Sequence, residues 1–117
     1  MKRVPPLLLL LAWVHASPVA AYSGADLESA LQHEEDLRAG VRLSETDMYL
    51  VGYAKGFVRA TSEALGANAL CLPADATVAQ AEAIILKYLK ANPELWQKNA
   101  VDLVAAALMV TFTCTKQ

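Results

Sequence analysis

Residues 71–114 have the sequence CLPADATVAQAEAIILKYLKANPELWQKNAVDLVAAALMVTFTC, and this stretch decides the fold. Cys71 and Cys114 are the only two cysteines of the chain, and the residues between them can form a few packed helices. If the protein is exported, a disulfide that closes this stretch into one unit is the simplest chemistry. A bridged cysteine is not a nucleophile, so the same feature removes the most obvious catalytic residue.

Two helices are predicted within this stretch. Thr77 to Gln80 form a capping-box pattern, in which the threonine oxygen accepts from the amide three residues on and the glutamine reaches back. The helix should end at Asn92-Pro93, because proline lacks an amide hydrogen and restrains the residue before it. After a short helical turn over residues 93–96, Asn99 can cap a last helix that is apolar on nearly all sides. The expected core residues are Val78, Ala81, Ile84, Ile85, Tyr88, Leu89, Val101, Leu103, Val104, Leu108, Met109, Val110 and Phe112, with Glu82, Lys87 and Lys90 in water.

Two further helices are predicted upstream, over residues 25–39 and 46–65. Ser44, Thr46 and Asp47 suit the start of the second, and Gly66 suits its end. The acidic run His33-Glu34-Glu35-Asp36 is interpreted as a solvated face, with nothing apolar around it to raise a pKa. The fold class is therefore all-α, a small bundle of four to five helices. The expected core residues are Leu27, Ala30, Leu31, Leu37, Met48, Val51, Phe57 or Val58, and Leu65.

A stripe of small residues runs along the second predicted helix: Gly52, Gly56, Ala60 and Ala64 recur every four residues. This spacing puts them on one face, where another backbone can come close. Glycine inside a helix costs about 1 kcal/mol relative to alanine. Two glycines therefore imply that close packing at this face offsets the lost helix stability. The stripe fits tight packing within the chain or a close contact between subunits.

The first 21 residues have the pattern of a cleaved export signal. Lys2 and Arg3 precede an apolar run, and Val19-Ala20-Ala21 offer small residues for a signal peptidase. The run is shorter than the roughly 20 residues that cross a bilayer, so no membrane anchor is expected after cleavage. Residues 22–117 then form a single domain, which we expect in the periplasm.

Composition and missing motifs exclude several function classes. Without the signal, eight basic and twelve acidic residues give a net charge of −4, which argues against nucleic acid as a partner. His33 is the only histidine left, and no nucleophile and base can be paired without it. Its acidic neighbours lack the spacing of a zinc helix. We therefore expect no catalytic residue, metal or cofactor, and a binding or structural role.

Several short motifs occur in order over residues 50–114, and together they resemble a known family. They are Gly52-Tyr53 with Gly56, Cys71 with Pro73, the Thr77–Gln80 helix start, Lys87-Tyr88-Leu89, Asn92-Pro93-Glu94, Leu103-Val104 with Ala107-Leu108, and Phe112 with Cys114. In these the chain resembles the Rap/Tai immunity proteins, small exported bacterial proteins that neutralise peptidoglycan amidases delivered by type VI secretion. Members often carry a second cysteine pair, where Leu31 and Leu50 stand here, and a proline where Thr113 stands. The loss of that pair predicts a less firmly held first helix.

The resemblance implies a homodimeric periplasmic plug, which binds an exported amidase toxin across its substrate groove and blocks the toxin's Cys/His pair. On expected exposure alone, the candidate partner-binding residues are Asn68, Leu72, Asp75, Glu94, Trp96 and Lys98. Trp96 fits a core position equally well. Two alternatives stay open: a periplasmic acid-stress chaperone of the HdeA kind, although those chains are lysine-rich, and an envelope adaptor domain.

Overall fold

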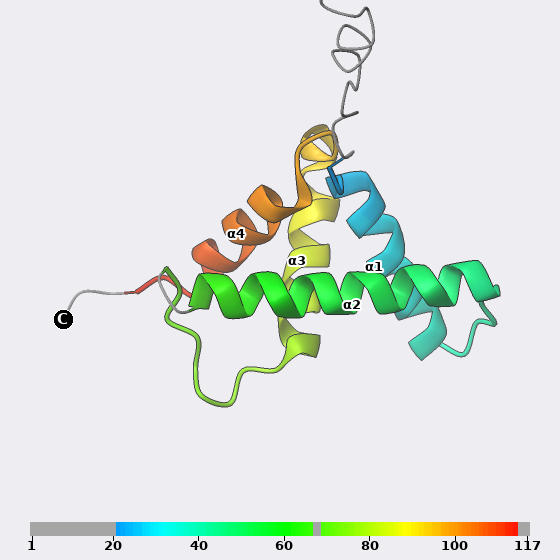
Figure 1. The fold of residues 1–117 in the computed structure, drawn as a ribbon, viewed down its shortest axis with the longest axis horizontal. Coiled ribbons are helices and arrows are strands. Elements are labelled where there is room, and N and C mark those ends of the chain that lie inside the picture. Colours follow the sequence, from blue (N-terminus) through cyan, green and yellow to red (C-terminus); the bar gives the residue numbers. More distant parts are fainter. Residues whose placement is uncertain (1–20, 67–68, 115–117) are drawn as a thin grey trace, which may run out of the picture.

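The computed structural model describes residues 21–66 and 69–114, and this part of the chain is helical (Figure 1). Its elements are α1 (Gly24–Arg38), α2 (Glu45–Gly66), α3 (Val78–Ala91), the 3-10 turn η2 (Pro93–Leu95) and α4 (Ala100–Thr111). The predicted all-α class is confirmed. The export signal was predicted for residues that lie, apart from Ala21, outside the described ones.

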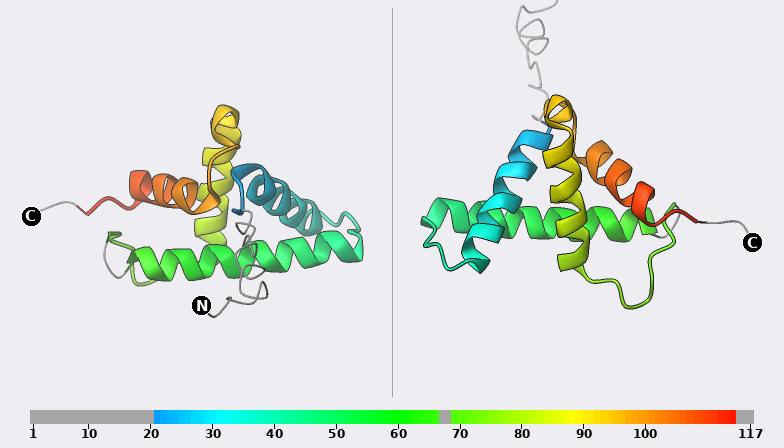
Figure 2. Two further views of the ribbon diagram at one scale, coloured as in Figure 1. Left: turned by 45° about the horizontal axis from the view of Figure 1, so that its top comes forward. Right: turned by 180° about the vertical axis from the view of Figure 1, so that it is seen from behind.

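The long helix α2 lies across one side of the other three helices (Figure 2). Helices α1, α3 and α4 diverge from a common corner, where η2 meets the start of α1 (Figure 1). Each of them packs against α2 along part of its length. One face of α2 therefore contributes to the core, while its opposite face has no neighbouring helix within the described residues.

The start of α1 is anchored at this corner by its backbone. The Gly24 amide donates to the Lys98 carbonyl and the Ala25 amide to the Trp96 carbonyl, each at 2.9 Å, and the Ala100 amide donates to the Tyr22 carbonyl at 2.8 Å. Ser23 and Asp26 form a capping box, which was not predicted from the sequence. These bonds hold the helix that was expected to be attached less firmly.

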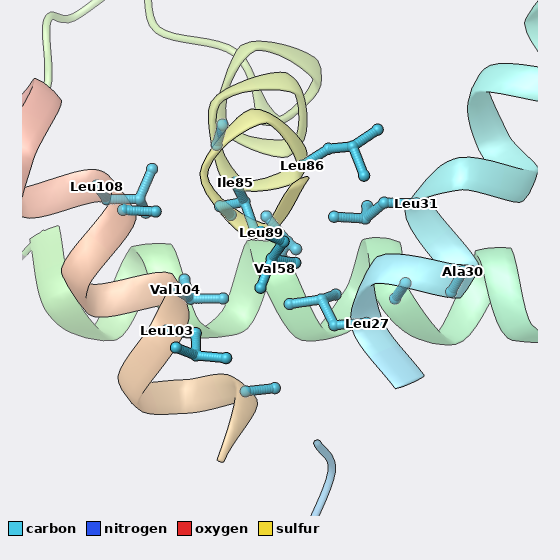
Figure 3. Close-up of a cluster of buried hydrophobic side chains, with 14 of the residues drawn as sticks. Leu27, Ala30, Leu31, Val58, Ile85, Leu86, Leu89, Leu103, Val104 and Leu108 are labelled. Atoms are coloured by element: carbon cyan, nitrogen blue, oxygen red, sulfur yellow. The ribbon is translucent and has the colours of Figure 1, made fainter. Parts of the chain in front are cut away.

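The core forms where the four helices meet (Figure 3). Leu37 and Met48, predicted as core residues, are exposed, because each lies in an end turn of its helix away from this centre. Val101, Met109 and Val110 are exposed as well, because only one side of α4 packs on α2 and α3. The fully buried large side chains are Leu27, Leu31, Val58, Ile85, Leu89, Val104 and Leu108.

Two helix caps were predicted from the sequence, one for α3 and one for α4. The Thr77 hydroxyl accepts from the Gln80 amide at 3.2 Å, and the Gln80 side chain accepts from the Thr77 amide at 2.9 Å, so the predicted capping box is confirmed. Asn99 precedes α4 but makes no capping bond with its side chain. Asn99 therefore stands at the predicted N-cap position without the expected side-chain bond, and the first amide of α4 donates to the Tyr22 carbonyl.

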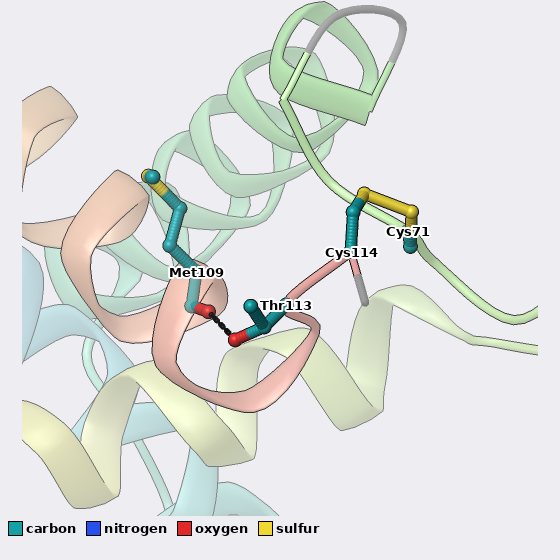
Figure 4. The surroundings of a disulfide bond; sticks show 4 residues. All are labelled: Cys71, Met109, Thr113 and Cys114. Carbon is teal, nitrogen blue, oxygen red and sulfur yellow. Dashed lines mark hydrogen bonds between the residues drawn. A yellow bond between two sulfur atoms is a disulfide. The ribbon is translucent and has the colours of Figure 1, made fainter. Parts of the chain in front are cut away.

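The predicted disulfide is confirmed: Cys71 and Cys114 are bonded, with Cα atoms 4.9 Å apart (Figure 4). The Cys71 amide also donates to the Phe112 carbonyl at 3.2 Å. The Thr113 hydroxyl, next to the bridge, donates to the Met109 carbonyl at 2.7 Å. The bridge therefore joins the segment before α3 to the end of α4.

Candidate partner-binding surface

The loop before α3 is fixed at the disulfide and against the core. Leu72 is half-buried and packs on the core cluster, whereas Asp75 is exposed. Asn68, the third candidate from this loop, lies outside the described residues. A cavity of about 180 Å³ lies beneath the loop, between Leu72, Phe112 and the facing sides of α2 and α3. The loop thus carries one exposed carboxylate, Asp75, beside a cavity lined partly by apolar side chains.

The corner at η2 is a compact projection with its backbone bonded internally. The Leu95, Trp96 and Lys98 amides donate to the carbonyls of residues 92, 93 and 95. The Trp96 indole donates to the Leu89 carbonyl at 2.8 Å and packs on the core, which makes it a structural residue of this corner. Glu94 and Lys98 are exposed, as the sequence predicted. Because the backbone is already ordered, binding through this corner would cost little conformational entropy.

The small-residue stripe lies on the outer face of α2. Gly52, Gly56, Ala60 and Ala64 are all exposed, and a Cβ added at either glycine would meet no described atom within 4 Å. The interpretation that the stripe packs within the chain was therefore wrong. The buried face of α2 consists of Val51, Ala54 and Val58, about half a helical turn away. A close contact between subunits stays a prediction.

No catalytic arrangement occurs among the described residues. His33 has its Nε2 atom 3.5 Å from Asp47 Oδ1 on a half-exposed surface. Within residues 21–66 and 69–114, no group of three or more His, Cys, Asp or Glu side chains is placed to hold a metal ion. None of the helices in the same ranges has the length and hydropathy that a membrane span requires.

A buried charge cluster joins α1, α2 and α3. The Glu34 and Glu82 side chains are only 7% and 4% exposed, and Lys55 and Arg38 cover them from the solvent side. Glu34 Oε1 accepts from Lys55 Nζ at 2.6 Å and from Arg38 Nη2 at 2.7 Å. Glu82 Oε2 lies farther from the same cations, at 3.7 and 3.5 Å, and its Oε1 atom has no partner among the described residues.

The two carboxyl groups of this cluster differ in pKa. Burial raises the pKa of Glu34, but the hydrogen bonds that it accepts from Lys55 and Glu82, with the charges of Lys55 and Arg38, outweigh burial and hold the pKa below its ordinary value. Burial, followed by the hydrogen bond and the negative charge of Glu34, raises the pKa of Glu82 to about 7. The prediction that Glu82 lies in water and that the acidic run of α1 is solvated throughout was therefore wrong for Glu82 and Glu34. Neither residue differs from a surface glutamate in the local sequence pattern.

We predict that Glu82 makes stability depend on pH near neutrality. Between the ordinary pKa of 4.5 and about 7, the folded protein keeps a proton that the unfolded chain has lost. The free energy of unfolding should therefore fall by roughly 2 kcal/mol as the pH rises from 5 to 8. Below pH 4.5 the lowered pKa of Glu34 acts in the opposite direction. Urea titrations across this pH range measure the slope.

Glu82→Gln should flatten this slope, because the amide keeps the side-chain shape without a titrating proton. We expect the variant to be more stable than the wild type at pH 8, by roughly 1 kcal/mol, since a charge is no longer buried. Glu94→Gln removes an exposed carboxyl group and serves as the control, with an unchanged slope. An unaltered pH profile in Glu82→Gln would contradict this assignment.

A sequence model of the Rap1a immunity proteins matches residues 23–114. The chain belongs to the Rap1a immunity protein family. The match begins at Ser23, the cap of α1, and ends at the disulfide residue Cys114, so it spans all the described helices. Among curated proteins, none matches the chain.

Membership of the Rap1a immunity family gives the chain the role of an immunity protein, which binds a cognate effector toxin. The family is not known for catalysis. The family match covers residues 23–114, so it includes α1 as well as residues 50–114, on which the predicted resemblance was based. In this structure the described candidate partner-binding residues lie on two separate parts of the surface. Leu72 and Asp75 are near the disulfide, and Glu94, Trp96 and Lys98 are at the η2 corner.

Proposed function

We propose that the protein is a periplasmic immunity protein, which binds a peptidoglycan amidase effector of type VI secretion and occludes its substrate groove. The observation that carries the proposal is the Rap1a family match over residues 23–114. An immunity role is favoured over an acid-stress chaperone or an envelope adaptor by the same match. The amidase as target comes from the resemblance of the chain to the Rap/Tai proteins.

Two features support action in the periplasm. The first 21 residues have the pattern of an export signal. The Cys71–Cys114 disulfide is the kind of bond that persists in oxidising compartments such as the periplasm. An amidase that cleaves peptidoglycan acts in the same compartment, so inhibitor and target would meet there.

Occlusion needs a projection that keeps its shape, and the η2 corner has one. Its backbone amides are bonded within the corner and to α1, and Trp96 is fixed by its bond to Leu89. Glu94 and Lys98 are exposed on it and available to a partner. A homodimer formed through the Ala60 and Ala64 end of the small-residue face would leave this corner free, because the corner lies at the far ends of α1 and α3 (Figure 1).

The test is protection of cells against a periplasmic amidase that is encoded beside this chain. Cells that export the amidase should lyse alone and survive with the full-length immunity protein. A version without residues 1–21 should fail to protect, because it stays in the cytoplasm. An inactive amidase is the control for toxicity without catalysis. Protection by the version that is not exported would contradict the periplasmic site.

Purified proteins separate physical inhibition from indirect protection. Amidase activity should fall linearly with added immunity protein and end at one inhibitor per amidase, as expected for tight occlusion without turnover. Sedimentation of the mixture should give a complex with two copies of each chain. An amidase that stays active in tenfold excess of the immunity protein would contradict occlusion, and a complex with one copy of each would contradict the homodimer.

A further inference from the structure

A tyrosine-lined pocket opens between the start of α1 and the first half of α2. Its volume is about 280 Å³, smaller than a typical ligand site and suited to one side chain. The residues that line it combine three aromatic rings with one carboxylate: Tyr22, Asp26, Ser29, Tyr49, Leu50 and Tyr53. We refer to it as the tyrosine pocket.

The rings of the tyrosine pocket are held by local geometry and are open to a partner. Tyr49 and Tyr53 are four residues apart on α2 and therefore on the same side of the helix; they are 69% and 48% exposed. Tyr22 packs edge-on against Tyr53, with ring centroids 4.9 Å apart, and contacts Phe57 at the same distance. Tyr22 is thus fixed by its contacts with Tyr53 and Phe57, whereas the rings of Tyr49 and Tyr53 remain accessible.

The tyrosine pocket combines hydroxyl groups with one acceptor-only group, the Asp26 carboxylate. Asp26 Oδ2 accepts from the Ser23 amide and hydroxyl, at 3.1 and 2.8 Å, while Oδ1 takes no hydrogen bond from the described residues. The Tyr22 hydroxyl is buried and has no partner in residues 21–66 or 69–114. Burial, then the charge of Asp26 and the neighbouring Tyr53, raise the pKa of Tyr22 to about 12. The carboxylate of Asp26, with Oδ1 unoccupied by the described residues, is the group at this pocket that would attract a positive ligand.

We propose that the tyrosine pocket binds an arginine side chain of the cognate effector. Electron-rich ring faces attract a cation, and arginine is the cation found most often against aromatic rings. Its planar guanidinium group can stack on tyrosine while its N–H groups donate to a carboxylate such as Asp26. The net charge of −4 that the chain has without residues 1–21 complements a basic region on the partner.

The choice of the effector as the source of the arginine rests on the proposed function. The pocket itself can be tested without an effector, using N-acetyl-arginine amide as the probe. Its neutral isostere, N-acetyl-citrulline amide, has the same shape without the positive charge. Tyrosine ring signals in NMR spectra of the protein purified from the periplasm report the titration. The arginine probe should shift the signals of Tyr22, Tyr49 and Tyr53 saturably, with a Kd about threefold to tenfold lower than that of the citrulline probe.

Variants assign the binding to these residues. Asp26→Asn removes the charge but keeps an oxygen that can accept from Ser23, and Tyr49→Leu removes the most exposed ring. Each should weaken binding of the arginine probe about threefold or more. Glu63→Gln, which removes an exposed negative charge about 15 Å farther along α2 than Tyr53, should not. Equal affinity for the two probes, or an equal loss in Glu63→Gln and Asp26→Asn, would overturn the proposal. Thermal melts check that each variant folds; Tyr49→Leu carries the test if Asp26→Asn loses stability.

Binding to the effector completes the test. Tyr49→Leu should raise the Kd of the amidase complex about tenfold, the order expected for an interface aromatic residue. Probe binding that persists while this Kd is unchanged would overturn the effector as the source of the arginine. If no amidase binds the wild-type protein, the proposed function fails, and the titration with the arginine probe still decides whether the pocket takes a guanidinium group.

Discussion

Replacing both cysteines by serine (C71S/C114S) is expected to lower the free energy of unfolding by about 4 kcal/mol. The disulfide closes a loop with a sequence separation of 43 residues, and in the chain-entropy model such a loop restricts the unfolded chain by about that amount. Both cysteines are exposed, so serine leaves no cavity and the change isolates the effect of the bond. A chain of this size has little stability to spare, because a small domain buries only a modest core.

Urea unfolding of the double variant and of the wild type, each with and without reductant, measures this effect. Reduced wild type should unfold at the same urea concentration as the variant, and reductant should leave the variant unchanged. Those two controls separate loss of the bond from the substitution itself. A variant that unfolds at the same urea concentration as the oxidised wild type would contradict a stabilising role of the bridge.

The fold was predictable where a local signal and its physical cause lie close together in the sequence. Thr77 and Gln80 cap α3 because both bonds are made within one helical turn. Pro93 ends α3 through its own ring and missing amide hydrogen. The disulfide was predicted because the chain has two cysteines and the pattern of an export signal. Each of these features needs no knowledge of how the helices are arranged.

The features that were missed depend on contacts between distant segments. Glu82 has the same helical spacing as a solvated residue, but it faces Glu34 and Lys55 once α1, α2 and α3 meet. Leu37 and Met48 have core spacing, but they lie past the region where the helices touch. The tyrosine pocket likewise brings Tyr22 and Asp26 against α2 residues more than twenty positions away. Hydrophobic periodicity determines which side of a helix is apolar, and the neighbouring helices determine which part of that side is covered.

Gly24→Val is expected to destabilise the fold by about 3 kcal/mol. Gly24 has no positive φ, so the position does not require glycine for its backbone conformation. It requires space: an added Cβ would overlap Leu103 Cδ1 and lie 3.1 Å from both the Cα and the carbonyl oxygen of Trp96. The backbone of Trp96 cannot retreat without stretching its own bond to the Ala25 amide. Overpacking at such a site typically costs about 1 to 3 kcal/mol, and the branched valine should reach the upper end of this range.

Gly56→Ala is the matched control, because it tests a glycine with empty surroundings in the same chain. Its Cβ would meet no described atom within 4 Å, and alanine is the better helix former by about 1 kcal/mol, so the variant should be more stable than the wild type. Urea unfolding at low protein concentration compares the two. A stable Gly24→Val variant would mean that α1 is not held against the η2 corner through this close approach. Destabilisation by Gly56→Ala that appears only at high protein concentration would instead place the outer face of α2 in a contact between subunits.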